Sequence, residues 1–518
     1  MNFLSLLTLY ILFVNSNEAA SILAVFPTPS ISHQVVFRPL TQELAKRGYE
    51  VTVITPDPAF REGEAPVNLT EIDVHDISYD IWIKTFMEST KGNKNDVMNV
   101  MMSILKSLIA VVDTQLKDDK VKSLIEDKSK KFDLIFIEAC VRPALIYSYI
   151  YKAPVILFSS LGGVLDNYAT IGASVHPSIY PAITRQRLNN LTLWEKVSEL
   201  YYDYITITEF DNMAKEENVM LRKHFGEDIP SVVELKDKVD MLFLNSHPVF
   251  EGIRPVPPSV VYLGGLHQKP GKELPKDLKS FLDSSKHGVI YISFGTNVDP
   301  TVLPADRIEV LVKTFSKLPY DVLWKWNNDV LPGRTENIRI SKWLPQSDLL
   351  KHPKVKLFVT QAGLQSTDES ITAGVPLIAI PLNGDQFYNA ERYEYHRIGI
   401  KLMMDSLTVE QFTNTINTII QDDSYRENVA KLRSLMYDQP MTPLERAVWW
   451  TEHVLRHGGA RHLRSPAANM SWAEYLELEL VLTVLLGLLV ASTLLVLVLC
   501  FVYKVVLRKV TPNKAKRS

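Results

Sequence analysis

The sequence predicts an α/β protein in which two doubly wound, Rossmann-like domains face a cleft, with one transmembrane helix near the C-terminus. Short apolar strands alternate with helical segments in two blocks that a proline-rich stretch separates. This pattern is typical of parallel sheets covered by helices. Residues 480–503 contain no charged residue and predict the transmembrane helix. The 518 residues are enough for these parts.

The chain begins with a predicted secretory signal peptide, residues 1–20. An apolar run from residue 3 to residue 14 is followed by small residues, as in signal peptides. The two cysteines are Cys140 and Cys500, and Cys500 lies inside the second apolar run. The portion between the runs therefore cannot form an internal disulfide. Three N-X-S/T triplets are predicted glycosylation acceptors if exposed: Asn68, Asn190 and Asn469.

The first α/β domain is predicted over residues 21–245. A strand from Ser21, a helix over residues 34–47 and a strand from Val51 form a β-α-β unit, which indicates a parallel sheet. Further elements are expected as strands over residues 132–139 and 153–160 and from Val239, and as a long polar helix over residues 191–225.

Residues 246–265 are rich in proline and lack helical periodicity, so they are predicted to be an extended linker. The β–α alternation resumes in the second domain, residues 266–440. Its strands are expected over residues 288–296, 320–326, 355–360, 375–381 and 398–403, and its helices near residues 307–318, 366–373, 386–396 and 408–421. Closing helices and a juxtamembrane segment are expected over residues 441–479.

The apolar run 480–503 is about 36 Å long as a helix, which is enough to cross a bilayer. A buried core helix is the alternative, but such helices rarely carry so long an uncharged run. Residues 504–518 are basic and should stay in the cytosol, which predicts a single-pass type I protein with lumenal domains. Lysines at the third and fifth positions from the end resemble a retrieval signal for the endoplasmic reticulum.

Ligands of doubly wound folds bind outside the carboxyl ends of the strands, so residues that follow strands are the candidate site. His33 follows the first strand of the first domain, and Glu138 stands at the end of the apolar strand over residues 132–139. An imidazole can take a proton from a hydroxyl if a second group orients it. The alternative for His33 is a helix cap or a hydrogen bond in the core.

In the second domain three polar clusters follow successive strands. Gly363 precedes a helix whose N-terminal N–H groups could bind phosphate, although a simple capped turn is the alternative. Trp343 and Gln346 could stack on a base and bond a nucleotide, and Asp385 and Gln386 could bind sugar hydroxyls. Together these residues predict a pocket for a base, a phosphate and a sugar.

The stretch from Trp343 to Ala390, WLPQ…FVTQAGLQSTDESITAGVPLIAIPLNGDQFYNA, closely resembles the signature of the UDP-glycosyltransferase family, in a form most like its insect branch. LTQELAKRGYEVTVIT near the N-terminus and PLERAVWWTEHVLRHGGARHLR before the membrane segment are also similar to animal members. The resemblance implies a GT-B fold and an inverting transfer of sugar from a UDP-sugar, without a metal ion or a cofactor.

The resemblance also implies roles for individual residues. Trp343 would stack on uracil, Gln346 would bond the nucleotide and Glu369 would hold the ribose. Thr296, Gly363 and Ser366 would approach the diphosphate, and Asp385 and Gln386 would bind the sugar. Lys325 stands where relatives often have a basic residue. The chain departs from the family at Gln361, where many relatives have His, and at Glu138, where they usually have Asp.

The expected donor is UDP-glucose, with UDP-glucuronate as an alternative, and the expected acceptors are small lipophilic alcohols or phenols. A membrane-anchored binding protein without turnover is the other reading, and Gln361 and Glu138 are the features that would support it. The net charge of −3 gives no reason to expect nucleic acid, and a homo-oligomer is left open. We expect the acceptor pocket to use residues 141–149 and 162–177 of the first domain.

Overall fold

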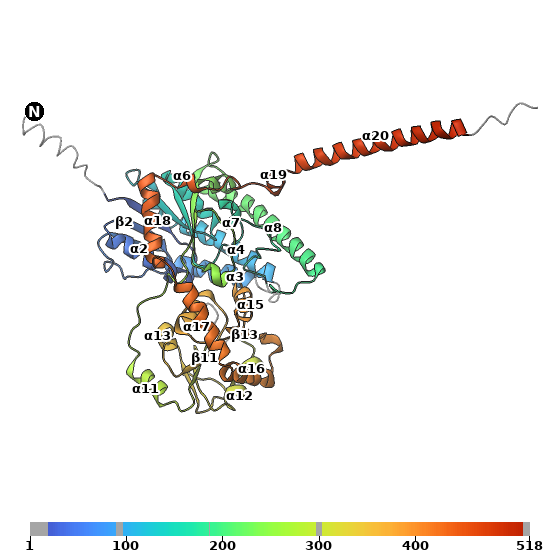
Figure 1. Ribbon diagram of the computed structural model, residues 1–518. Coiled ribbons are helices and arrows are strands. Elements are labelled where there is room, and N and C mark those ends of the chain that lie inside the picture. The colour runs from blue at the N-terminus through green and yellow to red at the C-terminus, as the bar shows by residue number, and fades with distance from the viewer. Residues whose placement is uncertain (1–18, 90–96, 186, 297–302, 511–518) are drawn as a thin grey trace, which may run out of the picture.

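The computed structural model describes residues 19–89, 97–185, 187–296 and 303–510, and the predicted signal peptide and basic tail lie largely outside these ranges. Two parallel sheets, each covered by helices on both faces, form the body of the molecule (Figure 1). The predicted α/β class is therefore confirmed.

The first sheet has seven strands in the order β3-β2-β1-β4-β5-β6-β7, all parallel. Its strands are β1 (Ser21–Val25), β2 (Glu50–Thr55), β3 (Leu69–Asp73), β4 (Leu134–Glu138), β5 (Val155–Ser159), β6 (Val239–Leu244) and β7 (Val260–Tyr262). Its helices are α2 (Ile31–Lys46), α3 (His75–Ser89), α4 (Val97–Gln115), α5 (Asp119–Glu126), η1 (Arg142–Leu145), α6 (Ile146–Tyr151), α7 (Asn167–Ile171), α8 (Leu193–Phe225), α9 (Val232–Leu235), η2 (Lys236–Lys238) and α10 (Pro248–Glu251).

The second sheet has six parallel strands in the order β10-β9-β8-β11-β12-β13. Its strands are β8 (Val289–Ser293), β9 (Asp321–Lys325), β10 (Ile338–Ser341), β11 (Val355–Thr360), β12 (Leu377–Ala379) and β13 (Gly399–Lys401). Its helices are α11 (Lys276–Ser284), α12 (Ala305–Phe315), α13 (Gln346–Leu350), α14 (Leu364–Ala373), α15 (Gln386–His396), η4 (Met404–Ser406), α16 (Val409–Gln421) and α17 (Ser424–Tyr437).

Strand residues alternate between two cores on opposite faces of each sheet. In β1, Leu23 joins one core while Ile22 and Ala24 join the other. In β8, Tyr291 packs in the core on one face of the second sheet and Ile290 in the core on the other face. Successive side chains of a strand point to opposite faces, so central strands read as unbroken apolar runs in the sequence. Those runs are why β1, β4, β5, β8 and β11 were predictable.

The prediction of an extended linker over residues 246–265 is wrong in part. It contains α10 and the edge strand β7, which pairs with β6 in the first sheet. Val260 and Val261 are buried there. The proline-rich sequence around this three-residue strand hid it, because Pro and Gly normally mark loops. The chain then crosses to the second sheet after Tyr262.

The chain returns to the first half after α17. Helix α17 packs on the second sheet through Val429 and Leu432. Helix α18 (Pro443–His457) packs beside α2 in the first half through Ala447 and Val448, and Figure 1 shows the two helices side by side. The segment continues through η5 (Arg461–Leu463) and α19 (Trp472–Tyr475).

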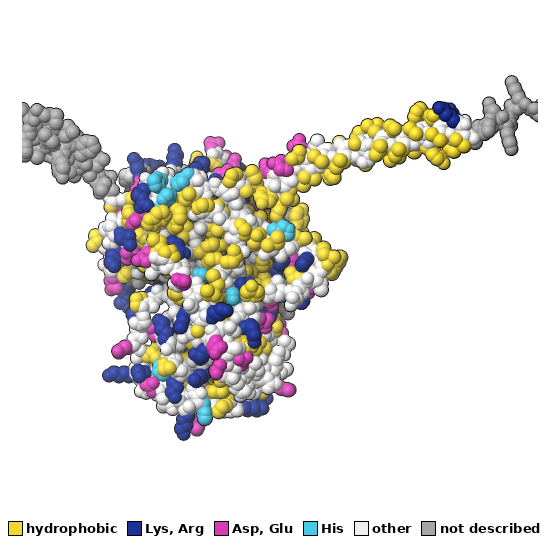
Figure 2. Space-filling view, in the orientation of Figure 1, with side chains coloured by type: hydrophobic (Ala, Val, Ile, Leu, Met, Phe, Trp, Pro, Cys, Tyr) yellow, Lys and Arg dark blue, Asp and Glu magenta, His cyan; other side chains and the backbone are white. Residues whose placement is uncertain are grey.

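Helix α20 (Leu478–Val510) extends away from the body and contains the predicted transmembrane segment. Its 33 residues include a strongly apolar window that is not buried against the protein. Figure 2 shows apolar side chains over most of its length, with acidic groups at its start and basic groups at its far end. The helix is long and apolar enough to cross a bilayer.

Candidate active site

A cavity of about 1900 Å³ lies between the two halves, at the carboxyl ends of both sheets. Each sheet reverses its direction of winding between two central strands, β1 and β4 in the first and β8 and β11 in the second. Residues that follow these strands line the cavity, among them His33 and Gly363. Doubly wound folds bind ligands at this reversal, and here the two reversals face each other.

His33 lies in the first turn of α2, directly after β1, and its ring points into the cavity. Its Nδ1 is 2.7 Å from Oε1 of Glu138. The Glu138 side chain is 1% exposed and the His33 side chain is 19% exposed. The backbone N–H of Thr28 donates to the second oxygen, Oε2, at 3.0 Å. The buried carboxylate is thus fixed by partners on both oxygens.

This contact sets the tautomer of the imidazole. When Nδ1–H donates to the carboxylate, Nε2 keeps its lone pair and can accept a proton. Glu138 is one methylene longer than the usual Asp, yet it reaches His33 at normal hydrogen-bond length. The presence of Glu138 in place of Asp, one of the two features that would support a binding protein without turnover, therefore does not prevent the pair from forming.

Helix α14 presents an uncapped N-terminus to the cavity. Gly363 is its N-cap residue, without a side-chain cap, and its first turn contains no acidic residue. The preceding Ala362 has a left-handed φ of 67°, which costs energy for a residue with a Cβ. Asn389 Nδ2 donates to the carbonyl of Ala362 at 2.9 Å and holds that turn. These observations favour an anion site over the simple capped turn.

Three residues predicted to contact the nucleotide bond to one another. Gln346 Nε2 donates to Ser366 Oγ at 2.9 Å and to Glu369 Oε2 at 2.7 Å. The hydroxyl of Tyr291 donates to Gln346 Oε1 at 3.0 Å. Burial raises the pKa of Glu369, and the Gln346 hydrogen bond opposes that shift. The network aligns an amide and a carboxylate at one end of the cavity.

Trp343 and Lys325 lie beside this network. The Trp343 side chain is 68% exposed, which is unusual for so large an aromatic ring. Lys325 ends β9, and its Nζ is 5.5 Å from the centre of the Trp343 ring. The same Nζ donates to the carbonyl of Gly295. Thr296 is exposed at the cavity edge. The open aromatic face of Trp343 and the cation of Lys325 thus lie in the same cavity as the uncapped helix.

Gln361, the residue that replaces the usual His, is buried after β11 and lines the cavity. Its Oε1 is buried without a hydrogen-bond partner among the described residues. Gly295 lies so close that a Cβ there would meet Gln361 Nε2 at 2.2 Å. The φ of Gly295 is +79°, so both space and conformation require glycine at this contact.

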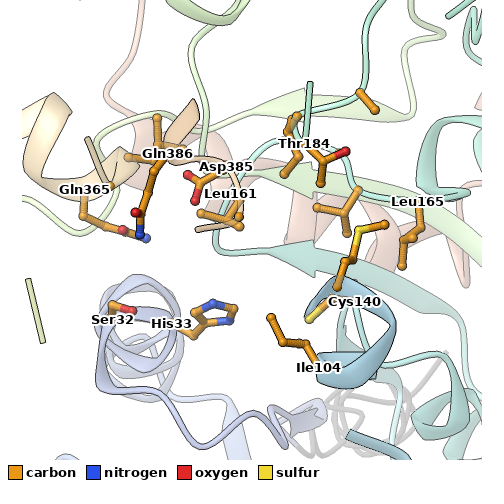
Figure 3. Close-up of a pocket in the computed structure, with 18 of the residues that line it drawn as sticks. Ser32, His33, Ile104, Cys140, Leu161, Leu165, Thr184, Gln365, Asp385 and Gln386 are labelled. Carbon is orange, nitrogen blue, oxygen red and sulfur yellow. The ribbon is translucent and has the colours of Figure 1, made fainter. Parts of the chain in front are cut away.

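Asp385 and Gln386 begin α15 and face His33 across the gap (Figure 3). Burial raises the pKa of Asp385 to about 6, while hydrogen bonding and the nearby His33 lower it. Asn389 Nδ2 donates to Asp385 Oδ2 at 2.8 Å. Gln386 Oε1 accepts from two loop N–H groups, those of Leu382 and Asn383. Gln386 therefore shapes the loop, and Asp385 presents its carboxylate to the cavity.

The apolar wall of the cavity differs from the expectation. Residues 141–149 do not line it, because they form η1 and α6 and bury their apolar side chains in the first core. Residues 162–177 do line it, as expected. The remaining wall comes from α3, α4 and α8, at Trp82, Met101, Ile104, Leu105, Leu108, Tyr202 and Ile207. The cavity ends beside the segment before the membrane helix, at Trp472, Tyr475 and Leu476.

Several contributing residues have no motif that would have revealed them. Gln365 Nε2 donates to the carbonyl of Ser160 at 3.1 Å and joins the two halves across the cavity. Asn389 couples Asp385 to the Ala362 turn. The one available signal was position: Ser160 follows β5, and Asn389 stands one helical turn after Asp385.

The three glycosylation triplets differ in accessibility. Asn190 is exposed in the loop before α8. Asn68 is partly buried, and its Nδ2 donates to the carbonyl of Ala45 at 3.3 Å. Asn469 Nδ2 donates to Asp237 Oδ1 at 2.6 Å, and the residue lines the cavity. Only the Asn190 side chain meets the condition that it be exposed.

Residues 21–515 match the family described as UDP-glucoronosyl and UDP-glucosyl transferase. The chain is a member of the UDP-glycosyltransferase family. The glycosyltransferase is 37% identical over 493 residues to the ecdysteroid UDP-glucosyltransferase of Spodoptera littoralis nuclear polyhedrosis virus. That alignment covers 91% of this chain and 95% of the viral protein. It is 31% identical over 478 residues to UDP-glycosyltransferase UGT5 of Dactylopius coccus, and the alignment covers 90% of this chain and 89% of that protein.

Solved structures give the fold of the glycosyltransferase. A UDP-glucose: anthocyanidin 3-O-glucosyltransferase in complex with UDP superposes with a TM-score of 0.57 at 16% identity. The match covers 84% of this chain and 99% of that chain. The predicted GT-B fold is confirmed, and the family membership makes the protein an enzyme that uses a UDP-sugar.

Proposed function

We propose that this glycosyltransferase transfers glucose from UDP-glucose to a hydroxyl group of a lipophilic acceptor, with inversion at the anomeric carbon. The observation that carries the proposal is the 2.7 Å contact between His33 Nδ1 and Glu138 Oε1. It leaves Nε2 directed into a cavity whose opposite wall holds the uncapped helix α14 and Asp385.

In the proposed reaction His33 Nε2 takes the proton of the acceptor hydroxyl while that oxygen attacks the anomeric carbon of glucose. The bond from this carbon to the diphosphate breaks, and UDP leaves with the electron pair. Glu138 stabilises the imidazolium that forms. Attack and departure on opposite faces give a β-linked product from an α-linked donor. General bases of this type contribute roughly 10²- to 10⁴-fold to a rate.

The negative charge that develops on the leaving diphosphate would be met by the N-terminal N–H groups of α14. An uncapped helix N-terminus carries roughly half a positive charge, and Gly363 and Ser366 let a phosphate approach it closely. Gln361 would add a neutral donor in place of an imidazole. We propose that the UDP-sugar is a co-substrate and that the reaction uses no resident cofactor or metal ion.

Two observations support glucose over glucuronic acid as the transferred sugar. The side chains that we assign to the sugar are Asp385, Gln386 and Asn383, which all line the cavity. The carboxylate of a bound glucuronate would face the carboxylate of Asp385, and like charges at close range repel. Relatives that are 37% and 39% identical to this chain also carry the name UDP-glucosyltransferase.

The shape and lining of the cavity support a bulky lipophilic acceptor. Its volume of about 1900 Å³ exceeds that of ordinary single-ligand pockets, about 300–1,000 Å³. Aromatic and aliphatic side chains of α3, α4 and α8 form much of the acceptor side. Several relatives are named for ecdysteroids, so a polycyclic alcohol is our first choice and a small phenol our second.

We further propose that α20 anchors the enzyme in the endoplasmic reticulum membrane as a type I protein with lumenal catalytic halves. The proposal rests on the apolar length of the helix and the basic groups at its far end. A protease-protection assay on intact microsomes tests it. Digestion of the body from outside the vesicles would contradict the orientation.

A donor-by-acceptor activity matrix tests the proposed reaction. The full-length protein in microsomes is incubated with radiolabelled UDP-glucose, UDP-glucuronate or UDP-N-acetylglucosamine against a panel of phenols and polycyclic alcohols. We expect glucoside formation with UDP-glucose and a lipophilic alcohol, and a β-linkage by NMR. Transfer of glucuronate alone, or an α-linked product, would contradict the proposal.

A further inference from the structure

Three side chains that commonly ligate metal ions meet at the wall of the cavity. His33, Glu138 and Cys140 each direct one ligand atom to a region where all three atoms lie within 4.8 Å of one another. Cys140 Sγ is 3.7 Å from Glu138 Oε1, the same oxygen that contacts His33 Nδ1 at 2.7 Å. Among the described residues this is the one group of three with such spacing.

Two of the three ligand separations lie near those of a tetrahedral zinc site, and the third, from His33 Nδ1 to Cys140 Sγ, is within 4.8 Å. Zinc binds nitrogen and oxygen at about 2.0–2.1 Å and sulfur at about 2.3 Å, so ligand atoms around it lie roughly 3.3–3.6 Å apart. The observed S–O distance of 3.7 Å already matches. The N–O distance of 2.7 Å must open by about half an ångström, which a small rotation of the partly exposed His33 ring supplies.

The surroundings also suit a soft divalent cation. Glu138 is buried and its other oxygen is fixed by the Thr28 N–H, so the carboxylate is held for binding. His33 and Cys140 both line the cavity, which gives an ion a path to the site and leaves a fourth position for water. A thiolate, an imidazole and a carboxylate together favour zinc over magnesium or calcium.

We propose that His33, Glu138 and Cys140 form an inhibitory zinc site within the active site. Bound zinc takes the lone pair of His33 Nδ1, so the ring proton moves to Nε2 and that atom can no longer accept a proton. The Cys140 thiol loses its proton to solvent on binding, as metal ligation requires. The inhibition rests on the proposed role of His33 as the base, whereas zinc binding itself does not.

Cobalt absorption tests the binding directly. Purified full-length enzyme in detergent is titrated with Co²⁺, and the charge-transfer band of a cobalt–thiolate bond is recorded, followed by displacement with Zn²⁺. We expect the band in the wild type and in Cys500→Ser, the matched control that removes the membrane-helix cysteine. Cys140→Ser should lose the band, and His33→Ala should weaken the binding of Co²⁺.

Inhibition is then measured for each variant relative to its own rate in the presence of a chelator. Loss of supporting residues around a metal typically costs about 10–100-fold in affinity, and loss of a direct ligand should cost at least that. We therefore expect the Zn²⁺ concentration for half-inhibition of Cys140→Ser to be at least about 10–100-fold higher than that of the wild type. Cys500→Ser should have the same half-inhibition concentration as the wild type.

Two results would overturn the proposal. One is a thiolate band that survives Cys140→Ser, and the other is equal zinc sensitivity of the wild type and Cys140→Ser. Failure of the proposed base is distinguished by a different result: the cobalt band follows Cys140 as expected, but zinc does not slow turnover. Thermal unfolding of each variant verifies that a lost band does not reflect a lost fold.

Discussion

The two halves of the glycosyltransferase have the same sheet topology but use their strand ends in different ways. The end of the first sheet offers the hydrogen-bonded pair of His33 and Glu138, beside a wall that mixes apolar side chains with charged ones such as Lys236. The end of the second sheet offers many polar groups: the uncapped α14, the Gln346 network and Asp385. In the proposed mechanism the first half activates the acceptor hydroxyl, and the second half holds the nucleotide sugar.

This difference has a consequence for mutations. Changes at the first sheet should affect turnover and leave donor binding intact, because no donor contact is expected there. Changes at the second sheet should affect donor binding more than the chemical step. An interaction that raises KM without changing kcat acts equally on the bound substrate and the transition state, so the two classes are separable by kinetics.

The largest expected effect is that of His33→Ala. Turnover should fall roughly 10²- to 10⁴-fold because the proposed general base is lost, while the UDP affinity measured by calorimetry should equal that of the wild type. His287→Ala, at an exposed site in the second half, is the matched control and should be silent. Retained turnover in His33→Ala would remove the base from the mechanism.

The next effect is that of Glu138→Gln, which keeps the size of the side chain but removes its charge. A Gln amide can present N–H to Nδ1 and so favour the wrong tautomer, for which roughly 10²- to 10⁴-fold in kcat is expected. Glu138→Asp, the common family residue, should retain more activity. If Gln and Asp variants behave alike, the carboxylate charge has no role.

Trp343→Ala tests the nucleotide end. Loss of aromatic stacking on a base costs about 1–3 kcal/mol, which corresponds to about 5- to 150-fold in affinity for UDP. Because the side chain is 68% exposed, the fold should survive. Trp449→Ala, on the surface of α18, is the control. Unchanged UDP affinity in Trp343→Ala would show that uracil binds elsewhere.

The affinity for UDP-glucose should depend on pH through Asp385. Its raised pKa of about 6 means that the carboxylate, which we propose accepts hydrogen bonds from sugar hydroxyls, is lost as pH falls through 6. One protonation weakens binding about tenfold per pH unit below the pKa. Calorimetry should show this for UDP-glucose but not for UDP, and the dependence should vanish in Asp385→Asn. A dependence that persists in Asp385→Asn belongs to another group.

The smallest effect concerns glycosylation. Asn190→Gln should remove one glycan, so the protein should migrate faster on electrophoresis. Its activity should not change, because Asn190 is exposed and does not line the cavity. Asn469→Gln should leave mobility unchanged, since its amide is bonded to Asp237. A glycan found on Asn469 would mean that this segment opens in the membrane-bound enzyme.

Central strands could be predicted from the sequence and edge strands largely could not. The central strands β1, β4, β5, β8 and β11 are buried on both faces, so they are continuous apolar runs. Three missed strands lie at sheet edges: β3 (LTEID), β7 (VVY) and β10 (IRIS). They are short or partly solvated and carry polar residues, which masks their strand character.

The candidate site was predictable to a similar extent. Eleven of the twelve predicted catalytic and UDP-sugar residues line the cavity, and Glu138 lies directly behind His33. His33, Gly363 and Asp385 were among those found because ligands bind at the carboxyl ends of strands in both halves, whereas Thr296 and Glu369 were among those that came only from the family resemblance. The acceptor wall was predicted only in part: residues 162–177 line it as expected, but the side chains of α3 and α4 were missed because they look like ordinary core residues. Contacts across the gap, such as that of Gln365, depend on tertiary structure.

The return of α18 to the first half means that the halves are joined twice, along one side of the molecule. The two crossings are adjacent: Gln439 Nε2 donates to His247 Nε2 at 2.7 Å, and Arg446 donates to the carbonyl of Tyr262 at 3.1 Å. Two neighbouring tethers permit the halves to swing about the line through both but resist twisting and sliding. A hinge motion about that line would therefore return the His33 imidazole and the N-terminus of α14 to the same alignment after each opening.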